Sequence, residues 1–210
     1  GISTGISLAL LGIIVGQFDN FLIGKLVSER ELGYYDRAYR LANWTNVLFT
    51  AVLGRIGFLT MAKVKEDAAR LQHTVRLSIW GVLMMGIPMA LVLCFAASEI
   101  VAVLYGPNYA VSAHFLRVLA ITNFMWTLIS VGFWLSVSLG HQSINFRFSV
   151  IQAIILVIVA TPLTILYGST GTLTGVVIAM SVALILYSRY TLRTVSLSLN
   201  ETFLRTGFSA

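Results

Sequence analysis

The sequence predicts an all-α integral membrane protein of about six transmembrane helices. Of its 210 residues, 58% are hydrophobic and only 10% are charged, a composition outside the range of soluble domains. The apolar residues form runs of about 20, the length at which a helix crosses a bilayer. Backbone groups must be paired in hydrocarbon, and no alternating segments indicate a barrel, so the runs are helical. Soluble enzymes and nucleic-acid-binding proteins are therefore excluded.

The apolar runs define one transmembrane domain, residues 1–190, followed by a tail. We expect its six spans at residues 5–23, 41–61, 77–97, 116–139, 148–167 and 173–190. Residues 191–210 are amphipathic and end without a stop signal, so we expect a truncated tail. No charged segment with a cleavage site precedes the first run, so we expect no signal peptide. The chain is expected to be part of a longer protein.

Polar segments separate the first three spans. The segment 25–40 is polar, and its charges lead directly into an apolar pattern, so the second helix should begin near Tyr34, outside the hydrocarbon. The charged segment 63–76 is expected to be helical at the membrane surface. It leads into the third span, which Pro88 should bend.

Turn residues punctuate the second half of the chain. The segment 99–109 (EIVAVLYGPNY) is too short to span, and its Gly-Pro-Asn sequence predicts a short interfacial helix followed by a turn. The fourth span follows it. Pro162 should bend the fifth span, and residues 168–171 (GSTG) predict a tight loop between the last two spans.

The orientation follows from the lysines and arginines near the span ends. The second, fourth and sixth polar segments hold eight of them, and the first, third and fifth hold five. This bias places both termini in the cytoplasm and predicts a multi-pass protein of the inner (cytoplasmic) cell membrane. The net charge of +6 then reflects topology and contact with anionic membrane lipids rather than nucleic acid.

An acidic residue lies within the first predicted span. One narrow sector of a helical wheel contains Gly5, Gly12, Gly16 and Asp19. One face of this helix therefore carries glycines along most of its length and an acidic residue near its end. Asp19 could line an internal cavity and bind a proton, a cation or a cationic partner, because ionisable groups at membrane depth are costly and often functional. Alternatively, the glycines pack closely against another helix, and Asp19 meets water or an arginine near the span end.

Three arginines share one face of the second predicted helix. Arg37, Arg40, Trp44 and Arg55 lie within roughly 60° of one another, over about 27 Å. A guanidinium binds phosphate through two donors, so this stripe would suit a diphosphate-bearing headgroup in a cavity. Alternatively, Arg37 and Arg40 anchor the outer interface and Arg55 reaches the inner headgroups. Asp19 and Arg40 should stand at similar depth, which permits an ion pair.

Residue types for metal binding and catalysis are sparse. His73, His114 and His141 lie on separate connections without acids or cysteines at ligand spacing, so no metal site is predicted. Cys94 is the single cysteine, so an intrachain disulfide is excluded. No nucleophile elbow, phosphate loop or paired acidic motif appears. These absences favour a transporter over an enzyme and predict no cofactor, with proton or sodium coupling left open.

Two segments resemble the C-terminal half of the polysaccharide flippases, the lipid-linked oligosaccharide exporters of the multidrug/oligosaccharidyl-lipid/polysaccharide superfamily. In DNFLIGKLVSERELGYYDRAYRL the matching residues are Asp19, Ile23, Gly24, Leu32, Gly33, Tyr35 and Ala38. In EIVAVLYGPNYAVSAHFLRVLA they are Ile100, Tyr105, Gly106, Ala113, Leu116 and Leu119, and the pairs Leu139/Gly140 and Gly171/Gly175 also fit. The resemblance covers nearly the whole chain.

The resemblance implies a transporter of two six-helix lobes around a central cavity that opens to either side of the membrane. This chain would be the second lobe, and the missing N-terminal half would be its partner. The family commonly has a proline near the inner end of the second helix of this lobe, whereas residues 57–61 (GFLTM) contain none. The missing proline bears on how the transporter would open and close, and it does not change the family resemblance.

The expected function is to flip a polyprenyl-diphosphate-linked oligosaccharide across the membrane for the synthesis of surface polysaccharide, including lipopolysaccharide. A cation-coupled multidrug exporter of the same superfamily is one alternative, and it would need an acidic cavity. A glycan-ligase or acyltransferase subunit is another, but the outer connections are short and carry no catalytic group. A non-catalytic polytopic membrane subunit remains a third.

Overall fold

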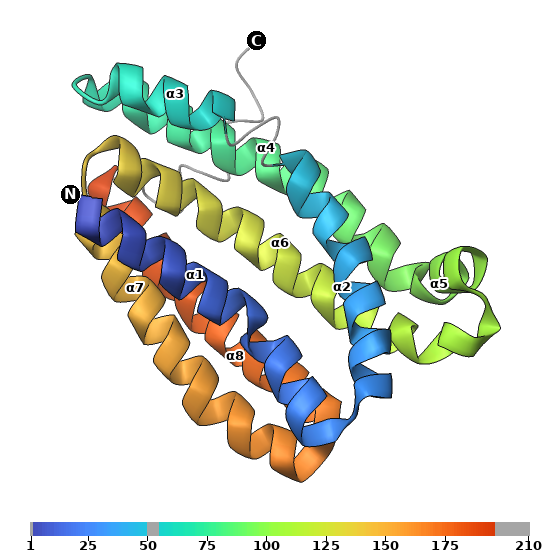
Figure 1. Cartoon of the computed structure of the whole chain (residues 1–210). Helices are drawn as coiled ribbons and strands as arrows, with labels where there is room; N and C mark the ends of the chain where they lie inside the picture. Colours follow the sequence, from blue (N-terminus) through green and yellow to red (C-terminus); the bar gives the residue numbers. More distant parts are fainter. Residues whose placement is uncertain (1, 50–54, 196–210) are drawn as a thin grey trace.

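The structure, a computed structural model, describes residues 2–49 and 55–195, and all regular secondary structure in these ranges is helical (Figure 1). The predicted all-α class is therefore confirmed for the described chain. The elements are α1 (Ile2–Leu22), the π-helical turn η1 (Ile23–Val27), α2 (Glu29–Phe49), α3 (Arg55–Val64), α4 (Ala68–Phe95), α5 (Ala97–Tyr105), the 3-10 turn η3 (Pro107–Tyr109), α6 (Ala110–Ser138), α7 (Gln142–Ile155), the π-helical turn η4 (Leu156–Ala160) and α8 (Thr161–Thr194).

Three helical stretches are long and apolar enough to cross a membrane, among the residues that the structure describes. They are Ala68–Phe95, Pro107–Ser138 and Gln142–Thr194, the last of which contains the chain reversal described below. Large apolar side chains cover much of the outer surface; Phe95 is 81% exposed and Val103 is 83% exposed. Such a surface suits lipid rather than water. The number of spans stays a prediction, and residues 50–54 of the second predicted span lie outside the described residues.

Helix α2 begins earlier than the apolar pattern predicted. Ser28 has extended backbone angles, and its hydroxyl accepts a hydrogen bond from the Glu31 amide at 3.2 Å. Ser28 and Glu31 thus occupy the first and fourth positions of a capping-box sequence. Two acidic residues in the first turn, Glu29 and Glu31, also stabilise the helix start, because their negative charges lie at the positive end of the helix dipole. The helix therefore starts at Glu29 and not near Tyr34.

Helix α4 likewise extends into the charged segment. The Asp67 carboxylate accepts a hydrogen bond from the Arg70 amide at 3.0 Å, which caps the helix at its N-terminus. Residues 68–76, predicted to form a surface helix, are thus the first turns of the same helix that carries the apolar run. Pro88 lies inside it.

The chain reverses direction at Gly168, within the segment predicted to be a tight loop. Gly168 has φ of +61°, a conformation that L side chains rarely adopt. The arms on either side pack closely: the hydroxyls of Thr164 and Thr172 lie 2.8 Å apart. A Cβ on Gly171 would approach the Leu163 carbonyl oxygen to 1.9 Å. Only glycine fits there, because the backbones touch.

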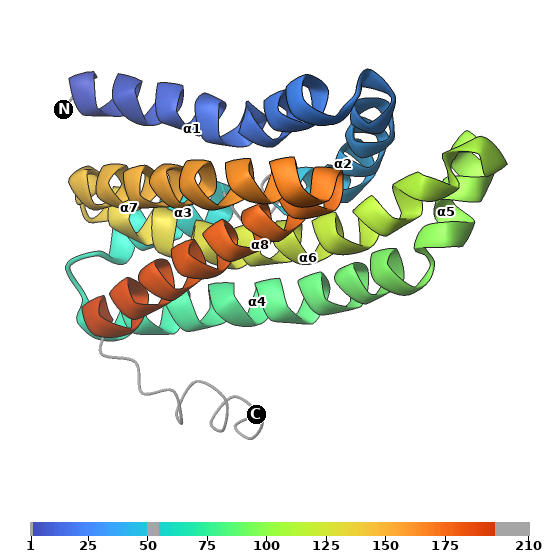
Figure 2. The ribbon, with the colours of Figure 1, turned by 90° about the horizontal axis from the view of Figure 1, so that it is seen from below.

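Helix α6 is the centre of the bundle, and it contacts α2, α4 and α8 (Figures 1 and 2). Helix α1 lies along α7 and also touches α8. Around Tyr35 and Phe115, a buried cluster joins α2 to α5 and α6. A polar contact joins α6, α7 and α8, because Asn145 Oδ1 accepts hydrogen bonds from the Ser136 and Tyr187 hydroxyls. The bundle therefore holds α1, α2, α6, α7 and α8 around one interior space.

Candidate functional site

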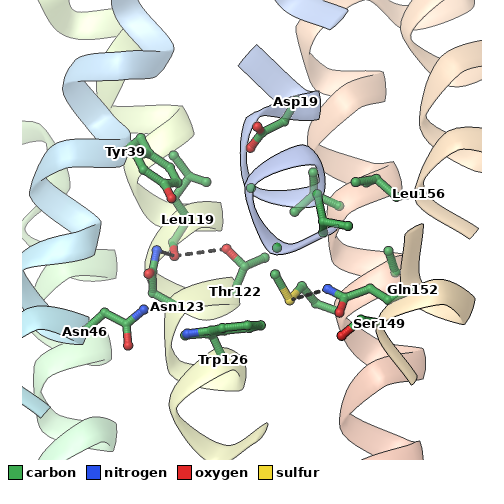
Figure 3. A pocket seen from close by; sticks show the side chains of 16 residues that line it. Asp19, Tyr39, Asn46, Leu119, Thr122, Asn123, Trp126, Ser149, Gln152 and Leu156 are labelled. Carbon is green, nitrogen blue, oxygen red and sulfur yellow. Dashed lines mark hydrogen bonds between the residues drawn. The ribbon is translucent and has the colours of Figure 1, made fainter. Parts of the chain in front are cut away.

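A cavity of about 280 Å³ lies between α1, α2, α6, α7 and α8 (Figure 3). Its walls combine small and apolar residues with polar ones from α1, α2, α6 and α7. The apolar and small lining residues are Gly12, Val15, Gly16, Leu119, Leu156, Val176, Ala179 and Met180. The polar ones are Asp19, Tyr39, Asn46, Thr122, Asn123, Trp126, Ser149 and Gln152.

Asp19 is the charged side chain among these lining residues, and none of them is a lysine or arginine. It is 6% exposed, near the C-terminal end of α1. One carboxylate oxygen accepts a hydrogen bond from the Tyr35 hydroxyl at 2.5 Å, and the other accepts from the Asn20 amide at 2.8 Å. Tyr35 is fully buried, so α2 holds the carboxylate in place at the cavity wall.

The small face of α1 opens onto this cavity. Gly12 and Gly16 line it together with Asp19, and a Cβ built on either glycine would meet no atom within 4 Å. These two glycines therefore provide space, and they do not pack closely against another helix. Gly12, Gly16 and Asp19 therefore border one cavity, and the role predicted for Asp19 stays a prediction.

Hydrogen bonds from their nitrogen atoms position the amide side chains of Asn123 and Gln152, and the amide oxygens are not used in these bonds. Asn123 donates its Nδ2 to the Leu119 carbonyl at 2.9 Å, and Gln152 donates its Nε2 to the Met180 sulfur at 3.5 Å. Each amide also carries an oxygen that can accept two hydrogen bonds. Figure 3 shows Asn123 and Trp126 on α6, Asn46 on α2 and Gln152 on α7, around the same space.

The predicted arginine stripe lies outside this cavity. Arg40 pairs with Asp36 of the same helix, Nε to Oδ2 at 2.9 Å, and its side chain is 71% exposed. The Arg37 guanidinium lies over the ring of Tyr109, 4.3 Å from the centroid. Trp44 is 72% exposed. The backbone of Arg55 begins α3, but its side chain lies outside the described part of the chain.

Asp19 and Arg40, whose similar depth would permit an ion pair, are each bonded to another partner in this structure. Tyr35 bonds the carboxylate of Asp19, and Asp36 binds the guanidinium of Arg40. Spacing in the sequence could have indicated the second pair, since residues four apart face each other on a helix. Arg40 and Asp36 are therefore a local surface pair.

Sequence reasoning missed most of the polar lining. None of the predicted site residues was Asn46, Asn123, Trp126, Ser149 or Gln152, all of which line the cavity. The available signal was the amide side chain inside an apolar run, as at Asn123 and Gln152. Polar groups at such positions face the bundle interior.

Residues 4–114 match the polysaccharide biosynthesis protein family, which is more than half of the chain. The chain belongs to this family. The predicted family resemblance is thereby confirmed, and the family is transporter-like and generally not catalytic. The matched residues of this polysaccharide biosynthesis protein include Asp19, Tyr39 and Asn46 of the cavity, whereas the lining residues of α6, α7 and α8 follow the matched segment.

Among curated proteins, the amylovoran biosynthesis protein AmsL of Erwinia amylovora is 24% identical over 143 residues. The alignment covers 68% of this chain and 37% of AmsL, so the chain spans well under half the length of this relative. No solved structure matches the chain significantly.

Proposed function

We propose that this polysaccharide biosynthesis protein flips a polyprenyl-diphosphate-linked oligosaccharide across the cytoplasmic membrane, for the synthesis of surface polysaccharide. The observation that carries the proposal is a cavity with several polar side chains inside a bundle whose outer surface is largely apolar. A lipid-linked sugar needs both: a polar space for the headgroup and a lipid-facing wall for its chain. Family membership supports the same substrate class.

The chemistry of the cavity suits the sugar part of the substrate. A sugar ring offers hydroxyls that donate and accept, and an apolar C–H face that stacks on aromatic rings. Amide groups of Asn46, Asn123 and Gln152 supply donors and acceptors, and Trp126 supplies a ring and an indole N–H. The volume of about 280 Å³ is at the lower end of small-ligand pockets. One sugar unit is the occupant we propose.

The diphosphate would meet the arginines of α2 and α3 outside this cavity. Arg37 and Arg40, with Arg55 and Trp44, are the residues proposed for it. In the full transporter, the present chain would form one six-helix lobe, and the other half of the protein would face it in alternating access. Replacing Arg40 or Arg55 by glutamine should abolish flipping while the protein still reaches the membrane, and unchanged flipping in both variants would remove the arginines from the site.

The sugar assignment can be tested by Asn123→Leu in the full-length protein. Leucine keeps the approximate volume but removes the amide, so we expect the flipping rate in proteoliposomes to fall about tenfold or more. Ser130→Ala is the matched control, because Ser130 lies on the same helix, bonds the Thr127 carbonyl and does not line the cavity. Equal rates for the leucine variant and the wild type would reject the cavity as the sugar site.

A cation-coupled multidrug exporter is the second candidate. It is favoured by Asp19, since a buried carboxylate attracts a cationic ligand. The two functions separate in one comparison: the full-length protein either exports a lipophilic cationic dye or moves a fluorescent lipid-linked oligosaccharide. Dye export without glycolipid movement would replace the flippase proposal.

A further inference from the structure

A second polar region lies on another face of α2, around Gly33. Two hollows of about 350 Å³ each share Gly33 and Arg37. Glu29, Arg30, Tyr34, Asn108 and Tyr109 complete one hollow, and Asp36, Arg40 and Tyr105 complete the other. We call the two together the Gly33 hollow. It contains none of the residues that line the interior cavity.

The Arg37 guanidinium is held in this hollow by aromatic rings. Its central carbon lies 4.3 Å from the Tyr109 centroid and 5.1 Å from the Tyr105 centroid. Gly106, with φ of +83°, turns the chain between α5 and η3 and so brings both tyrosines to the same arginine. Within the described chain, no carboxylate lies within ion-pair distance of Arg37. These cation–π contacts use no hydrogen-bond acceptor, so N–H donors of the guanidinium are left for a ligand.

Gly33 forms an open floor beside these donors. It is exposed, and a Cβ at this position would meet no atom within 4 Å. Arg30 stands one helical turn away, where its Nε donates to the Tyr34 hydroxyl at 3.0 Å. The hollow therefore offers a fixed cation, a second guanidinium and unfilled space at one point.

The charge of the hollow is positive. Its lining includes three arginines, Arg30, Arg37 and Arg40, against two acids, Glu29 and Asp36. Asp36 is already paired with Arg40, so it does not neutralise Arg37. An anion is the ligand that this balance favours, and a guanidinium binds the oxygens of a phosphate through parallel hydrogen bonds.

We propose that the Gly33 hollow binds the phosphate of a lipid headgroup, with Arg37 as the main ligand. A lipid is favoured over a soluble anion because charged residues and tyrosines gather here next to apolar helices, the composition found at headgroup level. The phosphate ester could belong to a bilayer phospholipid or to the polyprenyl diphosphate of the substrate. The first source is independent of the proposed flippase function, and the second rests on it.

Lipid retention by the purified full-length protein tests the proposal without any transport step. Native mass spectrometry would count bound phosphatidylglycerol and, separately, bound undecaprenyl diphosphate. We expect Arg37→Gln to lower retention of at least one of them about tenfold, as the loss of a charge-assisted bidentate contact implies. Gly33→Leu should do the same by filling the hollow without removing a contact. Arg189→Gln, which removes an exposed arginine from α8, is the control and should retain both lipids.

The pattern of loss identifies the source of the phosphate. Loss of phosphatidylglycerol alone assigns the hollow to bilayer lipid, and loss of undecaprenyl diphosphate alone assigns it to the substrate. Retention of both lipids by Arg37→Gln and Gly33→Leu at the wild-type level would overturn the proposal. Thermal melting of each variant identifies any that fails to fold, and a folded Gly33→Leu protein is sufficient to decide.

Discussion

Asp19 shows how one buried side chain connects two helices with a cavity. Its carboxylate belongs to α1, its hydroxyl partner Tyr35 belongs to α2, and the space in front of it is lined by both helices. A buried carboxylate is costly unless it is hydrogen-bonded or binds a cation. The bond from Tyr35 supplies part of that stabilisation, and an ion from the cavity would supply more.

Substitutions at Asp19 and Tyr35 distinguish a role in coupling transport to an ion gradient from a role in stabilising the fold. Asp19→Asn keeps the size and can still accept from Tyr35, but it removes the charge, so we expect transport to lose its dependence on a proton or sodium gradient. Tyr35→Phe removes only the donor and should keep that dependence, with lower stability. Transport by the full-length proteins with and without each gradient is the measurement. Wild-type gradient dependence in Asp19→Asn would remove Asp19 as the coupling group.

At the scale of elements, short polar signals determine where the long helices begin and turn. Ser28 starts α2 and Asp67 starts α4, each by accepting a backbone amide three residues along. Gly168 reverses the chain, and small residues let the two arms of the reversal approach closely. Tyr39 and Asn46 on α2 and Gln152 on α7 line the same cavity.

The chain segments before and after Gly168 approach closely, so an added methyl group between them should destabilise the protein. A Cβ on Gly175 would lie 2.5 Å from the Cα of Ala160, so Gly175→Ala should destabilise the protein by about 1–3 kcal/mol. Gly33→Ala is the control in the same type of helix, because nothing lies within 4 Å of its Cβ, and it should leave stability unchanged or raise it slightly. Thermal unfolding in detergent measures both. An equal effect of the two changes would argue against the close packing of the arms.

In the described part of the chain, the molecule is a helical bundle with a largely apolar outer surface, an apolar core and some polar side chains around an interior cavity. Residues such as Ile165 and Leu166 are 67% and 71% exposed, whereas Asp19 and Asn123 are 6% and 8% exposed and border the interior cavity. An outer surface with this many exposed apolar side chains suits lipid rather than water. The three helical stretches that are long and apolar enough to cross a membrane agree with a lipid environment.

Cysteine labelling in native membranes tests the arrangement as a whole. In a Cys94→Ala background, Gly12→Cys should react with a water-soluble maleimide, because Gly12 borders the open polar cavity. Ile165→Cys should not react, although it is exposed on the protein surface, because lipid covers it. The reverse order of reactivity would mean that water, not lipid, meets the outer surface.

Composition and local pattern were sufficient for several conclusions. They determined the helical membrane class, the turn at residues 168–171 and the shared face of Gly12, Gly16 and Asp19, because hydrophobicity and helical period are local properties of the chain. The family was indicated separately, by the resemblance of sequence motifs. The early starts of α2 and α4 were also encoded locally, at Ser28 and Asp67, but the apolar pattern hid them.

Only the tertiary structure decided what each face meets. A helical wheel placed Arg37 and Arg40 on one stripe. It could not show that tyrosines from the α5–η3 turn make cation–π contacts with Arg37, or that the cavity lies on another face. Likewise, Asn46, Asn123 and Gln152 are far apart in sequence, and they meet because α2, α6 and α7 pack around one space. The helical period determines in which direction each side chain points from its own helix. The residues that it contacts depend on how separate helices pack.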